Sequence, residues 1–147
     1  MKLGFSTLGC PDWTFDQVLD NARDMGYQAI EVRGIDGEMR PGAIRVFQAE
    51  NRPESLLKIR EHGLTLSDFG SSACFYEGNM EASLAEGRAS VDLCAAVGIP
   101  AVRVMGGSPD GGATPERQVH LVVAGVNALW EYANTPEVEI STQVHAR

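Results

Sequence analysis

The chain has 147 residues, of which 44% are hydrophobic and 22% charged, and its formal net charge is −8. This length suits one globular domain, and the negative charge excludes a nucleic-acid-binding surface, which needs clustered Lys and Arg. No apolar run reaches the ~18 residues of a membrane span, and the first residues lack the apolar core of a signal peptide. Since the three cysteines form no Cys-x-x-Cys pair, we expect a cytoplasmic domain with free thiols that acts on neither nucleic acid nor membranes.

Strand and helix patterns alternate along the whole chain. In chain order we predict a strand at 3–7, a helix at 15–25, a strand at 29–33, a helix from 53 to 62, a strand at 64–69, a helix at 80–97, a strand at 101–105, a helix from 115 to about 133 and a strand at 136–144. Thr14 and Gln17 form a capping box at the start of the first helix.

Three connections differ in composition from the elements they join. Residues 34–51 form a long connection that is too polar for a second core element and is typical of a functional loop. Residues 70–78 predict a small-residue loop, followed by Asn79 as a helix cap. The glycine-rich loop 106–112 leads into Thr114, a further capping residue, so it is either a phosphate cradle or a plain connection.

Three glycines mark a repeat. Gly26, Gly63 and Gly98 each follow a helical pattern directly, where a left-handed residue ends a helix. Their spacings are 63 − 26 = 37 and 98 − 63 = 35 residues. A repeat of this length with a short strand after each glycine predicts βα units, whose strands must run parallel.

Two architectures are compatible with such units. The length favours a flavodoxin-like doubly wound sheet, since a complete (β/α)₈ barrel needs about 250 residues. The strands favour a barrel, because Glu31, Ser67 and Arg103 are polar residues in mid-strand. A doubly wound sheet is covered by helices on both faces, whereas a barrel lets such residues point into its lumen near the carboxyl ends of the strands.

Four segments carry a resemblance to a known family. Residues 2–7, 25–32, 98–107 and 138–145 resemble, in order and spacing, the first five strands of the xylose isomerase-like barrels, the sugar-phosphate isomerase/epimerase proteins. The resemblance covers essentially the whole chain but only about the first half of the family's barrel. It implies one domain, 1–147, that is a half TIM-type barrel with about five parallel strands and four helices, truncated after the fifth strand.

The resemblance also implies a chemistry. Family members hold a divalent cation (Mn, Mg, Co or Zn) at the carboxyl-terminal mouth and use paired carboxylates to move a proton next to a sugar carbonyl. Their fifth strand ends in Glu-x-His, the Glu being a metal ligand, whereas this chain has Gln143 and His145. The resemblance makes Gln143 the candidate metal ligand, which offers a neutral oxygen in place of a carboxylate and cannot act as a base. We therefore expect one copy to form no complete metal site and to be inactive alone, and no catalytic residue is assigned.

Four residues are candidates for contact with a sugar or polyol: Glu31, Arg33, Arg103 and His145. Glu31 and Arg103 have an alternative role as a structural ion pair, and Arg33 as a solvated strand end. His145 lies at the carboxyl end of the last predicted strand.

Two other interpretations remain at this point: a non-enzymatic α/β small-ligand binding module, and a truncated fragment. Strand order separates the first from the half barrel, because a flavodoxin-like sheet has the order 2-1-3-4-5. A half barrel has two open edge strands, the first and the fifth, which invite pairing with a second copy, so we also expect a homodimer.

Overall fold

A computed structural model describes residues 2–107, 113–133 and 138–143. Its strands form one parallel sheet in the order β1-β2-β3-β4-β5. The strands are β1 (Gly4–Ser6), β2 (Ala29–Val32), β3 (Thr65–Cys74), β4 (Ala101–Met105) and β5 (Glu139–Gln143). This sequential order confirms the half barrel and shows that the flavodoxin-like alternative was wrong.

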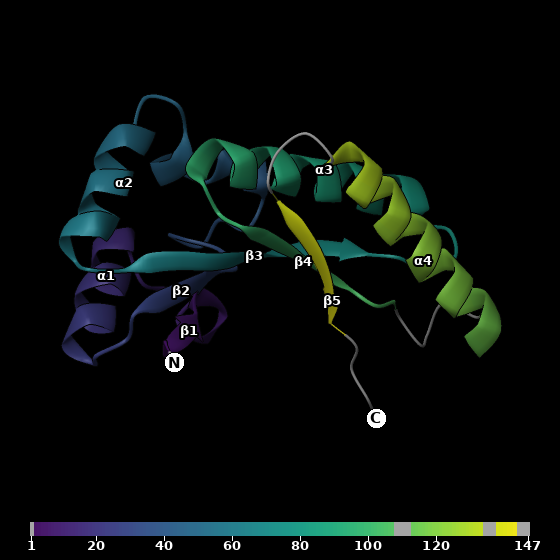
Figure 1. The fold of residues 1–147 in the computed structure, drawn as a ribbon, viewed down its shortest axis with the longest axis horizontal. Coiled ribbons are helices and arrows are strands. Elements are labelled where there is room, and N and C mark those ends of the chain that lie inside the picture. Colours follow the sequence, from purple (N-terminus) through teal and green to yellow (C-terminus); the bar gives the residue numbers. More distant parts are fainter. Residues whose placement is uncertain (1, 108–112, 134–137, 144–147) are drawn as a thin grey trace.

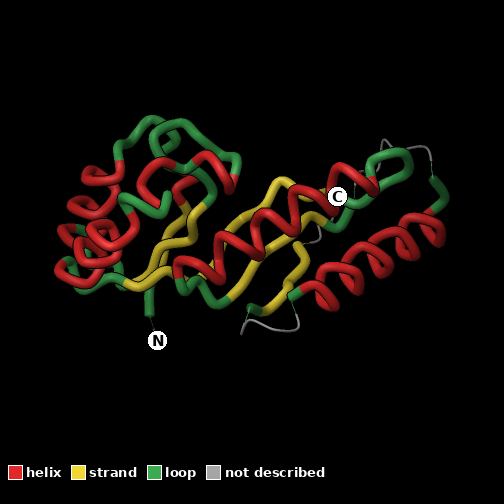
Figure 2. The backbone as a smooth tube through the Cα atoms, turned by 90° about the horizontal axis from the view of Figure 1, so that it is seen from above, coloured by secondary structure: helices red, strands yellow, loops and turns green. Residues whose placement is uncertain are grey.

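The helices connect successive strands and lie along the sheet (Figure 1). They are α1 (Phe15–Asp24), α2 (Arg52–Glu61), α3 (Met80–Val97) and α4 (Pro115–Tyr132), with three short 3-10 helices, η1 (Thr7–Gly9), η2 (Pro41–Ala43) and η3 (Arg45–Phe47). Figure 2 shows α3 running across the strands on the side that faces the viewer. Among the described residues, no helix is both long and apolar enough to cross a membrane.

The core lies between the helices and one face of the sheet. Alternate strand residues such as Val32, Phe69 and Val102 are fully buried on this face. Phe75 and Leu129 join them beneath α3 and α4. The opposite face of the sheet, which we call the lumenal face, carries the polar residues of the same strands.

The helix ends follow the sequence closely. The Thr14 N–H donates to Gln17 Oε1 (2.9 Å) and the Gln17 N–H donates to Thr14 Oγ1 (3.3 Å), so the capping box is confirmed. Gly26, Gly63 and Gly98 have φ of 78°, 70° and 80°, the left-handed conformation that their positions predicted.

Three predictions about the connections were wrong. Residues 70–74 are not loop but the second half of β3, because their small side chains leave room for the groups that cross this strand. The connection 34–51 does supply core residues, since Ile35, Ile44 and Phe47 are buried. Asn79 occupies the position before α3, but its side chain does not cap the helix and donates instead to Cys74 O (3.2 Å) and Ser83 Oγ (2.9 Å).

Candidate functional site

The polar groups of the lumenal face meet above one glycine of β3. Arg103 on β4 reaches across β3 to β2, where its Nε donates to Glu31 Oε1 (3.1 Å) and its Nη2 donates to the same oxygen. A Cβ at Gly70 would lie 2.6 Å from Arg103 Nη2, 2.7 Å from Arg33 Cδ and 3.0 Å from Glu31 Oε1. The absence of a side chain at Gly70 therefore lets these three side chains converge across the middle strand, and a Cβ there would force at least one of them to shift.

The ion pair is half-buried and extends to the edge of the sheet. The Arg103 and Glu31 side chains are 17% and 22% exposed. Arg103 Nη1 also donates to Gln143 Oε1 (2.5 Å) on β5. One guanidinium thus links β2, β4 and β5, and the structural pairing of Glu31 with Arg103 named as an alternative is present.

Arg33 is not the solvated strand end that was named as its alternative role. It is only 9% exposed, and its Nη2 donates to Ser72 Oγ (3.0 Å). Its Nη1 is buried and has no hydrogen-bond acceptor among the described residues. Burial and then the Arg103 charge lower the pKa of Arg33 from its ordinary value, while Glu86 and Glu31 act in the opposite direction. We call Glu31, Arg33, Ser72, Arg103 and Gln143 the lumenal cluster.

Asp68 lies beside this cluster and was missed by the sequence analysis, which singled out Ser67. The pairing of β2 with β3 shifts by one residue, so that Ile30 pairs with Leu66 but Glu31 with Asp68. Burial raises the pKa of Asp68, the Glu31 carboxylate raises it further, and the Ser67 hydroxyl and the Arg103 charge oppose the shift. A strict alternation of strand residues could not reveal this, because the bulge changes the residue that faces the lumen.

The raised pKa of Asp68 predicts how the stability of an Asp68→Asn variant responds to pH. Because the folded-state pKa exceeds the unfolded one, folding favours the protonated acid, and this stabilisation is lost as pH rises through the folded pKa. Asp68→Asn is therefore expected to raise the denaturation midpoint at neutral pH. The gain should disappear below the ordinary Asp pKa of about 3.9. Urea titrations at both pH values test this, with the exposed Asp12→Asn as control; an equal gain at both would contradict it.

The described residues do not fit a resident metal ion. Among them, no group of three or more His, Cys, Asp or Glu side chains could hold one. Gln143, which the resemblance predicted at the position of a metal ligand, accepts a hydrogen bond from the Arg103 cation, and this cation would repel a second one. His145 lies outside the described residues, as do residues 108–112 of the predicted glycine-rich loop.

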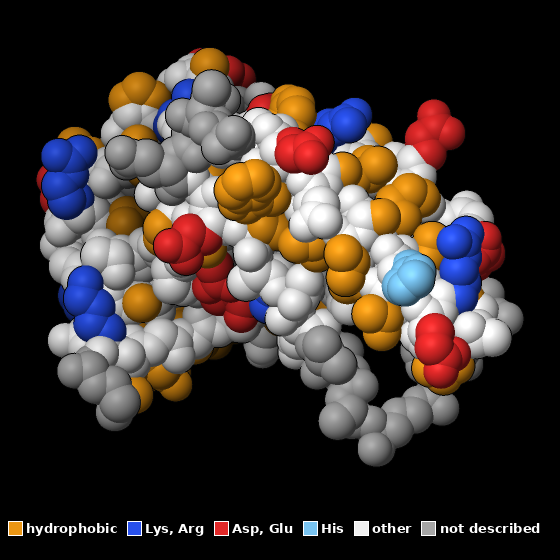
Figure 3. Space-filling model, turned by 45° about the vertical axis from the view of Figure 1, so that its right-hand side comes forward, with side chains coloured by type: hydrophobic (Ala, Val, Ile, Leu, Met, Phe, Trp, Pro, Cys, Tyr) orange, Lys and Arg blue, Asp and Glu red, His pale blue; other side chains and the backbone are white. Residues whose placement is uncertain are grey.

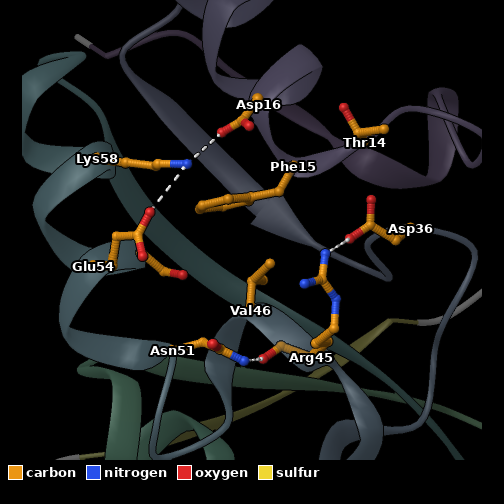
Figure 4. Close-up of a pocket in the computed structure, with 10 residues that line it drawn as sticks. Thr14, Phe15, Asp16, Asp36, Arg45, Val46, Asn51, Glu54 and Lys58 are labelled. Atoms are coloured by element: carbon orange, nitrogen blue, oxygen red, sulfur yellow. Dashed lines mark hydrogen bonds and ion pairs between the residues drawn. The ribbon is translucent and has the colours of Figure 1, made fainter.

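Three pockets lie near these elements, and the smallest, of about 50 Å³, is lined by Thr7, Arg33 and Gly34, among others. One of about 430 Å³ opens on the lumenal face and is lined by Glu31, Ser67 and Asp68, among others. Another of about 310 Å³ lies between α1 and α2 (Figure 4). In this last pocket Lys58 Nζ lies 2.9 Å from Asp16 Oδ1, and the other charged groups also pair with one another. Glu31 in the lumenal pocket is paired as well, with Arg103, but this pocket lies on the face that carries the lumenal cluster, and we take it as the candidate for a ligand.

Solved structures with the same fold are about twice as long. The chain resembles the IOLI protein with a bound zinc atom (TM-score 0.78, 15% identity, 98% of this chain and 51% of that one). It also resembles a protein from Sinorhizobium meliloti 1021 (0.70, 20%, 96% and 50%) and a xylose isomerase-like TIM barrel protein from Mycobacterium smegmatis in complex with magnesium (0.67, 15%, 99% and 55%). The chain thus spans about half the length of these proteins, and at such identities the likeness shows the fold alone.

A family profile gives the stronger result. No curated protein matches the chain. The profile described as "Xylose isomerase-like TIM barrel" matches residues 19–147, which is most of the sequence and includes β2 to β5. Together with the sequential parallel sheet and the polar lumenal face, this match establishes that the chain belongs to the xylose isomerase-like TIM barrel family.

Proposed function

We propose that the lumenal face binds a sugar or polyol as one half of a xylose isomerase-like site, and that one copy of the chain alone does not isomerise it. The observation that supports this is the Glu31–Arg103–Gln143 group. It brings a carboxylate, a guanidinium and an amide together at the lumenal face. Sugar hydroxyls both donate and accept hydrogen bonds, so a cluster with both kinds of partner suits them.

The roles of the residues follow from their chemistry. Glu31 accepts hydrogen bonds from hydroxyl groups, and Arg103 donates to hydroxyl or carbonyl oxygens. Ser72 is exposed beside the Arg33 guanidinium and adds a hydroxyl at the same face. We keep Arg33 and His145 as proposed substrate contacts.

Catalysis by the family's metal-assisted proton transfer needs groups that the lumenal cluster does not supply. Zinc and magnesium accompany two of the similar structures, but the described residues of this chain offer no ligand set for either. Glu31 is engaged by Arg103, and the neighbouring carboxylate, Asp68, accepts a hydrogen bond from Ser67. We therefore propose ligand binding without turnover for the single chain.

Titration with xylose and xylitol, followed by backbone NMR, tests the binding. The expected result is that amide signals of β2, β3 and β4 near the cluster shift, and that Glu31→Gln weakens binding at least about tenfold, or 1.4 kcal/mol. Glu61→Gln, at an exposed position on α2, is the matched control and should bind as the unmodified chain does. Shifts confined to the helical side, or equal binding by the two variants, would refute the lumenal site.

Turnover is tested separately. Xylose incubated with the chain and Mn²⁺ is expected to remain xylose, as measured by chromatography of the sugars. Formation of xylulose at chain concentrations at which sedimentation finds only single copies would refute the proposal that one copy is inactive.

A further inference from the structure

The two open edges of the sheet carry exposed apolar side chains. β1 and β5 each have a neighbour on one side only in the described sheet. Leu3 and Leu8 flank β1 and are both exposed. On the other side, α4 exposes Val119, Val123 and Trp130.

The exposed residues of α4 lie on the flank that faces away from α3. The opposite flank meets α3, since the Tyr132 hydroxyl donates to Asp92 (3.0 Å) and Arg88 lies over the Tyr132 ring. At about 100° per residue, the spacings of 4 and 7 residues put Val119, Val123 and Trp130 in one stripe, well away from Tyr132. Hydrophobic side chains gather along α4 in Figure 3.

At the other edge of the sheet, α1 is arranged in a similar way: one of its flanks contacts α2, and the other faces away from α2. This helix meets α2 through Asp16 and Asp20, which lie 2.9 Å from Lys58 Nζ and 3.2 Å from His62 Nε2. At about 100° per residue, Met25 at the end of α1 falls on the flank away from α2, and it is exposed. Each open strand is therefore accompanied by a helix flank that has no neighbour among the described helices: the flank of α4 is apolar, whereas that of α1 carries Gln17 and Asn21 with Met25 at its end.

We propose that a second copy of this chain covers these surfaces, with β5 of one copy pairing in parallel with β1 of the other and the α4 stripe packing against α1. One copy offers both edges, so a ring of two satisfies every edge and closes. The charges at the two edges are complementary. Parallel pairing puts the starts of β1 and β5 side by side, and these carry the exposed, oppositely charged Lys2, just before β1, and Glu139, at the start of β5.

The assembly would complete the lumen. Two copies carry ten parallel strands, twice the five of one copy. They enclose both lumenal clusters in one interior, wider than that of an eight-stranded barrel. This inference goes beyond the proposed function. Its test measures the mass of the assembly without metal or sugar, so dimer formation and sugar binding can each be refuted independently of the other.

The experiment is sedimentation of the full chain over a concentration series. The unmodified chain is expected to be a dimer. Val123→Glu should weaken it at least roughly a hundredfold, because in a dimer of the variant each of the two seams buries one added charge. Leu57→Glu is the matched control, since Leu57 on α2 is 49% exposed and Val123 51%, but Leu57 lies at neither edge. Far-UV circular dichroism checks that each variant is folded.

A mixing experiment tests the head-to-tail arrangement. Leu3→Glu impairs the β1 edge and Val123→Glu the β5 edge, so each variant alone should be monomeric. A mixture of the two variants should form dimers. One of the two seams then joins the unmodified β5 edge of the Leu3→Glu chain to the unmodified β1 edge of the Val123→Glu chain. A monomeric unmodified chain, a Val123→Glu dimer as tight as the control, open oligomers that grow with concentration, or no dimer on mixing would overturn the proposal.

Discussion

Gly125→Ala is expected to lower the free energy of unfolding by about 2 kcal/mol, although alanine is the better helix former. A Cβ at Gly125 on α4 would lie 2.3 Å from Cδ1 and 2.4 Å from Cγ of Phe75. The Phe75 ring is fully buried and cannot move aside as an exposed side chain would. Overpacking a core costs about 1–3 kcal/mol, and contacts this short place Gly125→Ala at or above the upper end of that range. The better helix propensity of alanine offsets about 1 kcal/mol of this cost.

Urea denaturation of four variants measures this: Gly125→Ala, Gly42→Ala, Phe75→Leu and the double variant of Phe75→Leu with Gly125→Ala. Gly42→Ala is the control, because a Cβ at Gly42 would have no atom within 4 Å. In a Phe75→Leu background, Gly125→Ala should cost much less than in the unmodified chain, since the smaller side chain leaves room for the methyl group. Equal costs in both backgrounds would mean that the close approach of helix and ring does not limit the residue at 125.

Arg103→Met is expected to destabilise the fold by about 2 kcal/mol. It leaves the Glu31 carboxylate half-buried without its partner and leaves Gln143 Oε1 without its donor. Removing one member of a fully buried pair costs about 3–5 kcal/mol, and the remaining exposure of these side chains reduces this value.

A surface pair of the same type supplies the control. Arg117 and Glu77 are paired at 3.0 Å, but their side chains are 56% and 51% exposed. Arg117→Met should therefore cost less than about 1 kcal/mol. When Glu31 is already Gln, Arg103→Met should lose most of its effect on the denaturation midpoint. A loss that persists in that background would mean that Arg103 stabilises the fold mainly through other contacts.

The sequence predicted the elements whose cause is local. Helix starts such as Thr14 and helix ends such as Gly98 depend on a few neighbouring residues, and they lie where the pattern placed them. The parallel βα order followed from the repeat of glycine and strand. The Glu31–Arg103 pair could be proposed because polar residues in mid-strand need a partner.

What the sequence could not show depends on contacts between distant segments. Residues 70–74 have the small side chains of a loop, yet they are small because Arg33 and Arg103 cross Gly70. On the helical side, Ser90 on α3 donates a hydrogen bond to Ser71. The apolar residues Ile44 and Phe47 stand in a segment with no helical or strand periodicity, so their burial could not be predicted from the sequence pattern. The bulge that turns Asp68 towards the lumen is equally invisible in one strand alone.

The sequential strand order has a consequence for how the chain acquires its structure. Each strand of the described sheet pairs with the strand made just before it, so no early segment must wait for a distant late one. During synthesis from the amino terminus, each βα unit can add to a surface that already exists, as in solenoid repeats. Growth by addition leaves the newest edge open at every stage, and β5 is the last such edge in the described chain.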